Sequence, residues 1–479
     1  MNEQYRRREV LSIAGSSGFV VLAGCSGGSP DPTSTPTEPG GGTTSFPADD
    51  ESTASQTDSS TASNAGSLWE FPARAVSRNW SMPRHDAGHT NYNPVSAGPT
   101  SPPTVLWEAE PIPESSLRSR IGTILVQDGV VYVMDQEECA GGVGGCGTSA
   151  SVAISAVNEN NGSKLWDYQL GPDTGARVLG VDENAVYLGQ FTDNEPLYFE
   201  AVSLQDGSNM WSRTLDSVTY RDFTWYPLLH NGYIIADGQG QQYSDKVVAL
   251  NAESGETEWE IDSASNSNQR RLAAAGEKLI ETGGASDVVY RIIDINSGSV
   301  INTVESANYS IAPASGAESS PAIGPEKILL RHLGRPSSLW GIRLVGPDQV
   351  PSEGVPLEEG KIVGNYGVNR RAKLALTETT LNIAERNRAS GNDKCFSYDY
   401  NGNLLWQSEA PAKSIVVDQN SIYVEGVDAQ THTVTSLDRD SGDTRWEYDI
   451  QEVPTDATDI VPAHNRVYLS HDEKLIALG

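Results

Sequence analysis

The chain has 479 residues and a formal net charge of −31, from 64 acidic residues against 33 basic ones. This length exceeds the usual size of one compact core, so it predicts either several domains or one large repeat architecture. The strong negative charge argues against nucleic acid as a partner. Lysine is scarce, with Lys164 the first in the chain, which is typical of proteins adapted to high salt; ordinary acidic solubility is the alternative interpretation.

The N-terminus has the layout of a lipoprotein signal peptide. Arg7 and Arg8 precede a mildly apolar stretch, residues 10–22, that is too short to cross a bilayer as a helix. The Arg pair resembles a twin-arginine export signal, and Leu22-Ala-Gly-Cys25 resembles a lipobox. We therefore expect residues 1–25 to be a signal peptide, with cleavage before Cys25, lipidation of its thiol, and anchoring at the outer face of the cytoplasmic membrane or cell surface.

Residues 26–72 are rich in Ser, Thr, Pro and Gly, with few side chains that could form a core. A flexible coil of about 40 residues spans roughly 35 to 40 Å. We interpret this segment as a disordered tether that holds residues 73–479 clear of the membrane.

Beyond the tether, one unit recurs in which a strand, a tight Gly turn and a strand ending in Trp follow one another. Clear copies are Ala156-Val-Asn-Glu-Asn-Asn-Gly-Ser-Lys-Leu-Trp166 and Ala249-Leu-Asn-Ala-Glu-Ser-Gly-Glu-Thr-Glu-Trp259. Gly supplies the positive φ of the turn, and the Asp or Asn before it caps the turn with its side chain. The Trp residues that close a unit are Trp166, Trp211, Trp259, Trp406 and Trp446.

A second hairpin precedes each unit, as in Gln127-Asp-Gly-Val-Val-Tyr-Val133, so that each period holds four short strands. Hairpins at Gly276 and Pro325 supply two degenerate copies. The last copy, ending at Gly479, is one strand short, and Thr104-Val-Leu-Trp107 is a lone closing strand. We predict an all-β, eight-bladed β-propeller in which the N- and C-terminal strands close the last blade.

The unit Ala-(Leu/Val)-(Asp/Asn)-x-x-x-Gly-x-x-x-Trp resembles the repeat of the pyrroloquinoline-quinone (PQQ)-like propeller family, which includes BamB-like assembly lipoproteins and quinoprotein dehydrogenases. The segment from Trp80 to Pro94 is similar to the lead-in before the first blade of that family. The resemblance implies that the Trp residues are structural and dock one blade against the next.

Quinoprotein dehydrogenases have a bonded pair of adjacent cysteines over the quinone and a calcium site beside a catalytic Asp. This sequence has no adjacent cysteines and no matching acidic constellation, so we expect no PQQ and no other cofactor. Cys139 and Cys146 flank a Gly-rich loop and are predicted to form a disulfide, while Cys395 is expected to be a buried thiol.

Other motifs carry little chemistry. Gly142-Val-Gly-Gly-Cys-Gly147 lacks the helix that a dinucleotide site needs. Asp438, Asp440 and Asp443 lie in a turn that recurs elsewhere with Asn or Ser, which favours a structural turn over calcium. His85 and His89 have zinc-pair spacing only in a helix, which their neighbours Gly88 and Asn91 disfavour. We therefore predict no catalytic residue and no metal site.

In a four-stranded blade, the hairpins joining strands one to two and three to four open on one face. These hairpins are tight here, whereas the connections on the other face are long, so we expect binding on the long-loop face. Basic residues gather just before the innermost strands on that face, and they could bind an anion or pair with neighbouring carboxylates. The candidate ligand-binding residues are Arg118, Arg120, Arg177, Arg221, Arg270, Arg271, Arg370 and Arg371, and Lys413 lies on the same rim.

The sequence thus predicts a non-catalytic extracytoplasmic binding or assembly module with a lipid anchor and a protein or glycan partner. Two alternatives stay open: a PQQ-dependent oxidoreductase, and a protein that binds surface polysaccharide or another anionic ligand.

Overall fold

A computed structural model describes most of the chain beyond residue 77. The described residues are 78–87, 89–112, 121–135, 153–170, 176–190, 196–219, 227–240, 245–263, 271–283, 288–306, 322–323, 328–333, 340–345, 373–385, 393–410, 413–427, 432–450, 459–471 and 473–479. They belong to one compact unit, Asn64–Gly479, and the other unit, Met1–Ser63, lies wholly outside them. The predicted signal peptide with Cys25 and the tether therefore lie outside the described residues.

Every secondary-structure element in the described residues is a β-strand, which confirms the all-β prediction. The strands of the first half are β1 (Val105–Ala109), β2 (Ile121–Gln127), β3 (Val130–Asp135), β4 (Ala153–Asn158), β5 (Lys164–Gln169), β6 (Ala176–Val181), β7 (Ala185–Gln190), β8 (Pro196–Ser203), β9 (Asn209–Thr219), β10 (Leu228–His230), β11 (Tyr233–Gly240), β12 (Asp245–Asn251), β13 (Thr257–Asp262), β14 (Arg271–Ala275), β15 (Lys278–Gly283), β16 (Val288–Asp294) and β17 (Val300–Ser306). Those of the second half are β18 (Ala322–Ile323), β19 (Ile328–Leu333), β20 (Trp340–Val345), β21 (Lys373–Leu376), β22 (Thr380–Glu385), β23 (Lys394–Asp399), β24 (Leu404–Ser408), β25 (Ile415–Val417), β26 (Ser421–Val427), β27 (His432–Asp438), β28 (Thr444–Ile450), β29 (Ile460–Ala463), β30 (Arg466–His471) and β31 (Lys474–Leu478).

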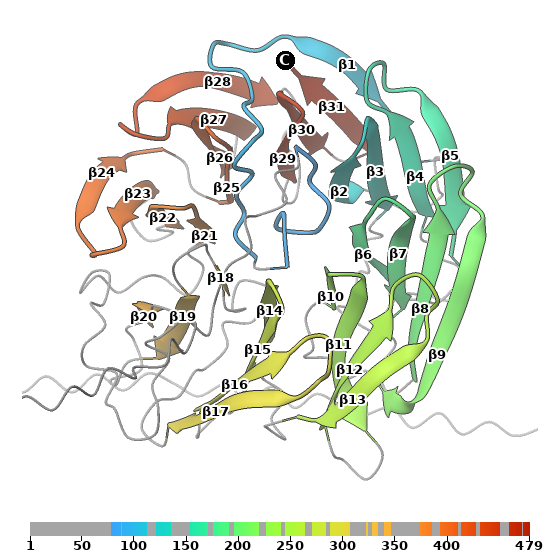
Figure 1. The fold of residues 1–479 in the computed structure, drawn as a ribbon. Coiled ribbons are helices and arrows are strands. Elements are labelled where there is room, and N and C mark those ends of the chain that lie inside the picture. The colour runs from blue at the N-terminus through green and yellow to red at the C-terminus, as the bar shows by residue number, and fades with distance from the viewer. Residues whose placement is uncertain are drawn as a thin grey trace, which may run out of the picture. The chain divides into compact units, whose positions relative to one another are not determined.

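Consecutive strands pair antiparallel in groups of four (Figure 1). Separate four-stranded sheets are formed by β2–β5, β14–β17, β21–β24 and β25–β28, and β18–β20 form a three-stranded sheet. The groups β6–β9 and β10–β13 join in one eight-stranded sheet, because Gln239 and Gly240 of β11 pair with Thr219 and Val218 of β9. The predicted hairpin at Gly276 joins β14 to β15, and β18 and β19 flank the one predicted at Pro325.

Strands from the two ends of the described unit form the last sheet. Its order is β1-β31-β30-β29, and β1 runs antiparallel to β31, with Glu108 opposite Ile476. Figure 1 shows blue β1 beside dark red β31. The lone strand predicted at Thr104–Trp107 therefore completes the C-terminal copy, as the sequence indicated.

Neighbouring strand groups contact one another through their first strands. These contacts run from β2 to β6, β6 to β10, β10 to β14 and β14 to β18, then from β21 to β25, β25 to β29 and β29 back to β2. The hairpins after β2, β6, β10, β14, β25 and β29 all lie at one end of these strands. We call this end of the unit the turn face, and the opposite end the loop face.

The closing Trp of one copy packs on the Gly turn of the next. A Cβ atom added to Gly207, which has φ of +71°, would lie 2.7 Å from Cε3 of Trp166, so this turn needs Gly both for its φ and for the indole. The indole NH also donates to a backbone carbonyl of that turn: Trp107 to Glu159 (2.8 Å), Trp166 to Leu204 (3.0 Å), Trp211 to Ala252 (3.1 Å), Trp259 to Ile295 (2.6 Å) and Trp406 to Arg439 (3.0 Å). The structural role predicted for Trp166, Trp211, Trp259 and Trp406 is confirmed, and the Trp446 indole NH donates to the Pro99 carbonyl instead (2.7 Å).

A polar lead-in segment, residues 78–87 and 89–98, crosses the turn face before β1 (Figure 1). Its backbone pairs in turn with first strands of sheets that are far apart in sequence. Trp80 exchanges hydrogen bonds with Val126 of β2, Ser81 O accepts from Val181 of β6, Ala87 O from Ala274 of β14, Thr90 O from Leu376 of β21, and Asn91 O from Val417 of β25. This segment therefore links five sheets at the turn face.

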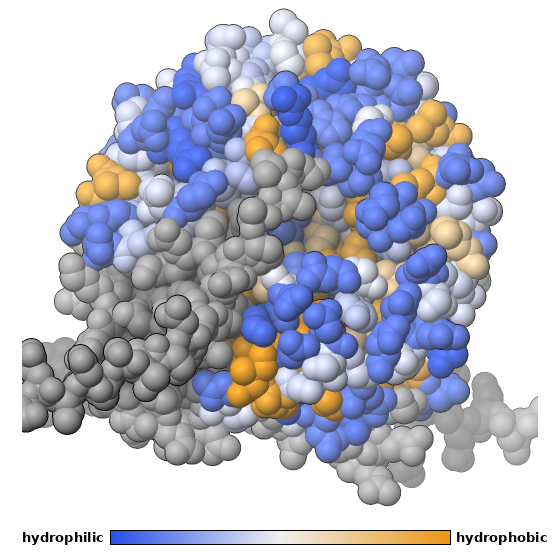
Figure 2. Space-filling view, in the orientation of Figure 1, coloured by the Kyte–Doolittle hydropathy of each residue, from blue (hydrophilic) through white to orange (hydrophobic). Residues whose placement is uncertain are grey.

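The surface on view in Figure 2 is mostly hydrophilic, with separate apolar patches. Exposed large apolar side chains lie near the starts of outer strands, two of them immediately before Trp406: Val105, Leu106, Leu165, Met210, Val300, Ile301, Leu404 and Leu405. Among the described residues, no helix is long and apolar enough to span a membrane.

Candidate functional site

A cleft of about 820 Å³ opens on the turn face, between the lead-in segment and the turns of three successive strand groups. The lead-in segment contributes one wall, and the hairpins after β2, β6, β10 and β12 contribute the others. The lining residues are Asn79, Ser81, Met82, His85, Asp86, Ala87, Pro94, Gln127, Asp128, Val181, Asp182, Glu183, Asn184, Leu229, His230, Asn231, Gly232, Tyr233, Asn251, Ala252 and Glu253. A volume of this size is typical of ligand sites.

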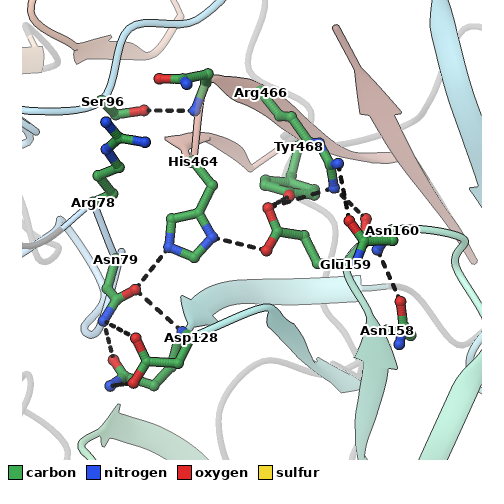
Figure 3. A network of polar contacts seen from close by, with 12 residues as sticks. Arg78, Asn79, Ser96, Asp128, Asn158, Glu159, Asn160, His464, Arg466 and Tyr468 are labelled. Carbon is green, nitrogen blue, oxygen red and sulfur yellow. Dashed lines mark hydrogen bonds and ion pairs between the residues drawn. The ribbon is translucent and has the colours of Figure 1, made fainter.

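A hydrogen-bond network fixes one end of the cleft (Figure 3). His464, in the turn between β29 and β30, lies between two partners: its Nδ1 is 2.8 Å from Glu159 Oε2 and its Nε2 is 2.8 Å from Asn79 Oδ1. Tyr468 donates to the other oxygen of Glu159 at 2.8 Å. Arg466 adds an ion pair to Glu159 and donates to its carbonyl oxygen. The network joins the β2–β5 sheet to the sheet formed by β1, β31, β30 and β29.

Asn79 carries this network into the cleft. Its Nδ2 donates to Gln127 Oε1 at 2.9 Å and to Asp128 Oδ1 at 3.2 Å, and its Oδ1 accepts from the backbone NH of Asp128. Gln127 in turn donates to Asp128 Oδ2 at 3.0 Å. Because Asn79 is nearly buried and every polar atom of its amide is engaged, the lining side chains at this end are held in one arrangement.

The network sets the charge of Glu159. Burial on its own would raise the pKa of this carboxyl, but the hydrogen bonds from His464 and Tyr468, and the charges of His464 and Arg466, lower the pKa overall. Glu159 is therefore ionised at neutral pH while almost buried.

The floor of the cleft is apolar. Met82 and Leu229 are buried, and both pack against Gly180, where an added Cβ atom would lie 2.8 Å from Leu229 Cδ2 and 3.1 Å from Met82 Cγ. Val181 and Ala87 extend this floor. Gly180 thus lets the lead-in segment and β10 approach β6 closely.

The rim of the cleft is acidic. Asp182 accepts hydrogen bonds from the backbone NH groups of Asn184 and Ala185 and from the Tyr187 hydroxyl, which fixes its carboxylate. Glu183 and Glu253 are exposed. No Lys or Arg is among the residues that line the cleft in the described part of the chain.

His230, the last residue of β10, is one of the two imidazoles that line the cleft. Burial lowers its pKa, although the hydrogen bond between Nε2 and the Gly276 carbonyl (2.8 Å) and the charge of Asp86 act in the other direction. This ring is therefore neutral at physiological pH and donates from Nε2.

The predicted disulfide pair, Cys139 and Cys146, lies outside the described residues, as do most of the predicted ligand-binding residues: Arg118, Arg120, Arg221, Arg270, Arg370 and Arg371. Arg177 is the second residue of β6 and Arg271 the first of β14, so both lie within first strands at their loop-face ends, whereas the sequence analysis placed them just before these strands. Lys413, on the same rim, forms a 3.3 Å ion pair with buried Glu425. The arginine rim and the long-loop contact surface stay predictions.

The turn that begins at Asp438 has the structural role that its sequence predicts. Asp438 accepts from the backbone NH groups of Asp440 and Ser441 and pairs with Arg445 at 2.6 Å. His85 and His89 lie in non-helical backbone with φ of +80° and +55°.

Sequence reasoning missed the cleft, because Asp128, Asp182 and Asn231 look like ordinary turn residues. No local pattern in the polar lead-in marks the cleft, because the strands that pair with its backbone lie far away in the sequence.

The absence of a quinone site of the dehydrogenase kind stays a prediction, because Cys139 and Cys146 lie outside the described residues. The four cysteines of the sequence are separated from one another, and Cys395 is buried in β23, where burial raises the pKa of its thiol to about 12. Within the described ranges, no three His, Cys, Asp or Glu side chains are arranged to hold a metal ion.

Comparison with known proteins identifies relatives of the repeat. A family model described as outer membrane protein assembly factor BamB matches residues 149–324 and 353–478. No curated protein matches the chain.

Two solved structures, both quinohemoprotein alcohol dehydrogenases, share the fold at low sequence identity. The chain is similar to the quinohemoprotein alcohol dehydrogenase from Comamonas testosteroni, with a TM-score of 0.54, 13% identity, and coverage of 84% of this chain and 80% of that one. For the quinohemoprotein alcohol dehydrogenase ADHIIG from Pseudomonas putida HK5, the TM-score is 0.51 and the identity 11%, with coverage of 84% of this chain and 80% of that one. For BamB from Moraxella catarrhalis, the TM-score is 0.42 and the identity 14%, with coverage of 68% of this chain and 88% of that one.

Proposed function

Because the chain belongs to the family described as outer membrane protein assembly factor BamB, we propose that it is a non-catalytic binding or assembly module held outside the cytoplasmic membrane. The scaffold is an eight-bladed propeller. Its blades are the groups β2–β5, β6–β9, β10–β13, β14–β17, β18–β20, β21–β24, β25–β28 and β29–β31 with β1. The succession of contacts between first strands, from β2 onward and from β29 back to β2, supports this assignment.

The observation that carries the proposal is the turn-face cleft. It is preformed, since backbone pairing fixes the lead-in segment and the hydrogen-bond network fixes Asn79, Gln127 and Asp128. A rigid scaffold that presents a polar cleft from several turns suits recognition of a partner. The propeller family hosts both binding proteins and enzymes, so function has to be argued from such a site rather than from the fold.

Export and anchoring complete the proposal. The Arg7-Arg8 pair and the Leu22-Ala-Gly-Cys25 motif support twin-arginine export and lipidation of Cys25. The C25S variant tests the anchor. After export, the variant should be absent from the membrane fraction and should incorporate no lipid label, whereas the wild-type chain should be found in the membrane fraction and carry the label. Retention of C25S in washed membranes would contradict lipid anchoring.

The function is tested by affinity capture from intact native cells after chemical crosslinking, beside a titration of the purified protein with PQQ and Ca²⁺. We expect one membrane-associated protein complex and no quinone absorbance or dye reduction with alcohols. PQQ-dependent dye reduction would contradict the proposal in favour of an oxidoreductase. Recovery of glycan alone would contradict it in favour of polysaccharide binding.

A further inference from the structure

We propose that the turn-face cleft binds a Lys or Arg side chain of the partner protein, with the aliphatic stem on the apolar floor and the cationic head at the acidic rim. This inference rests on the proposed function, because it names the chemistry of the group that the partner presents.

The first step is the charge of the cleft. Asp128 and Asp182 line it, and the groups of the described residues that donate hydrogen bonds to them are all neutral: amide groups, backbone NH groups and a tyrosine hydroxyl. Neutral donors hold the two carboxylates in place without cancelling their charge. A cleft lined by one sign of charge focuses the field and concentrates the opposite charge.

The second step is the rim. The carboxylates of Glu183 and Glu253 are exposed and make no hydrogen bond or ion pair within the described ranges. Burial chiefly raises the pKa of the Tyr187 hydroxyl, and the charges of Asp182, Glu183 and Glu253 raise it further. These three carboxylates come from two different hairpins and act on the same point, so their fields add at one side of the cleft.

The third step is the apolar floor, which is independent of the charge. Met82, Leu229 and Val181 line the cleft and are buried, whereas Glu183 and Glu253 are exposed. Lys and Arg bury their methylene stems along apolar surface while the head stays with water or acceptors. An inorganic cation gains nothing from such a floor, whereas a Lys or Arg side chain matches both parts of the cleft.

The carboxamides add directional acceptors. Asn184 and Asn231 belong to two hairpins around the opening, whereas the Asn251 oxygen already accepts from the backbone NH groups of Glu253 and Ser254. Because a guanidinium group offers five donors in a fixed fork, several acceptors around one opening suit Arg in particular.

The test uses full-length mature protein and fluorescence anisotropy of two rhodamine-labelled peptides, one of five arginines and one of five citrullines. Citrulline keeps the shape of arginine and removes the charge. The E183Q/E253Q variant removes two rim charges, and E447Q/D449N removes two charges from exposed positions of β28 as the matched control. Measurements are made at the lowest salt at which each variant unfolds cooperatively.

We expect the arginine peptide to bind wild type and the control alike, with affinity falling as salt rises, and to bind E183Q/E253Q roughly fivefold or more weakly. The citrulline peptide should not bind. Equal losses in the two variants would show general attraction to an acidic surface and would overturn the inference, as would equal binding of both peptides. Agmatine competing as well as the arginine peptide would assign the cleft to a free small cation and would also overturn it.

The outcome is separable from that of the proposed function. If affinity capture recovers the same membrane complex with wild type and with E183Q/E253Q, the cleft inference is wrong and the assembly function stands. If capture recovers no protein complex while the arginine peptide still binds in the cleft, the assembly function fails and the cation site remains.

Discussion

At the scale of single residues, burial and hydrogen bonding act on ionisable groups of this protein in opposite directions. Burial dominates at Asp459, whereas hydrogen bonds and nearby charges dominate at Glu159. Neither effect could be predicted from the sequence, because the partners of Glu159 lie more than 300 residues away in β30 and the turn before it. Long-range contacts of this kind leave no local pattern.

Glu159→Gln should destabilise the protein most at neutral pH. The lowered pKa of Glu159 means that its contribution is present above about pH 4.5 and is lost as the pH falls through the folded-state value. Removing the charge while His464 and Arg466 remain should cost about 2 kcal/mol at pH 7. Chemical denaturation at pH 7 and pH 3.5 measures this, with exposed Glu447→Gln as the control. A cost that is the same at both pH values would contradict the account.

Asp459→Asn should have the opposite effect. Burial, helped by the charge of Glu425, raises the pKa of Asp459 to about 6, against the hydrogen bond from Ile124 and the charge of Lys373. A raised acid stabilises the fold at low pH and costs stability as the pH rises through 6. The variant keeps an oxygen for the Ile124 NH and should gain about 2 kcal/mol at pH 7.5 but nothing at pH 3.5. Lower stability than wild type at pH 7.5 would contradict this.

At the scale of elements, the repeat could be predicted because each unit contains its own Gly turn and most units end in a Trp. Gly207 sits in the turn that Trp166 covers, and both residues belong to patterns that repeat along the chain. The lead-in segment has no such pattern. Trp80 pairs with Val126 and Asn91 with Val417, and these partners look like any other residue of a buried strand. The cleft that this segment completes was therefore not predictable from sequence.

Gly207→Ala and Gly232→Ala separate the two roles of a turn glycine. Both residues have positive φ, +71° and +77°, so both variants pay the conformational cost of about 1 kcal/mol. Only Gly207 lies against an indole, since an added Cβ atom at Gly232 meets nothing within 4 Å. Gly207→Ala should therefore cost about 2 kcal/mol more, measured by chemical denaturation. Equal costs would show that the Trp contact adds nothing to stability.

At the scale of the whole molecule, the pairing of β1 with β31 joins residues near 105 to residues near 478. Sequence predicted this closure, because the last copy lacks one strand and the first segment supplies one. The side-chain partners of the predicted arginine rim could not be predicted from the sequence. Arg177 and Arg271 lie at the loop-face ends of first strands, and the partners of such side chains depend on neighbouring sheets.

The net charge of −31 predicts a salt requirement. Repulsion among carboxylates destabilises the compact state, and salt screens it within about 10 Å at 0.1 M and about 3 Å at 1 M. We expect the thermal unfolding midpoint to rise steadily between 0.1 and about 2 M KCl. Calorimetry measures it, and a midpoint that falls or stays constant over this range would argue for ordinary acidic solubility instead.

The proposal that a partner protein binds in the turn-face cleft is tested most directly by site-specific photo-crosslinking in native cells. A photoreactive residue is placed at position 183 in the cleft, at position 177 on the loop-face end of β6, and at position 447 on the outer strand β28. The account predicts one discrete protein adduct from position 183 and none from position 447. An adduct from position 177 without one from position 183 would move the contact surface to the loop face and contradict the account.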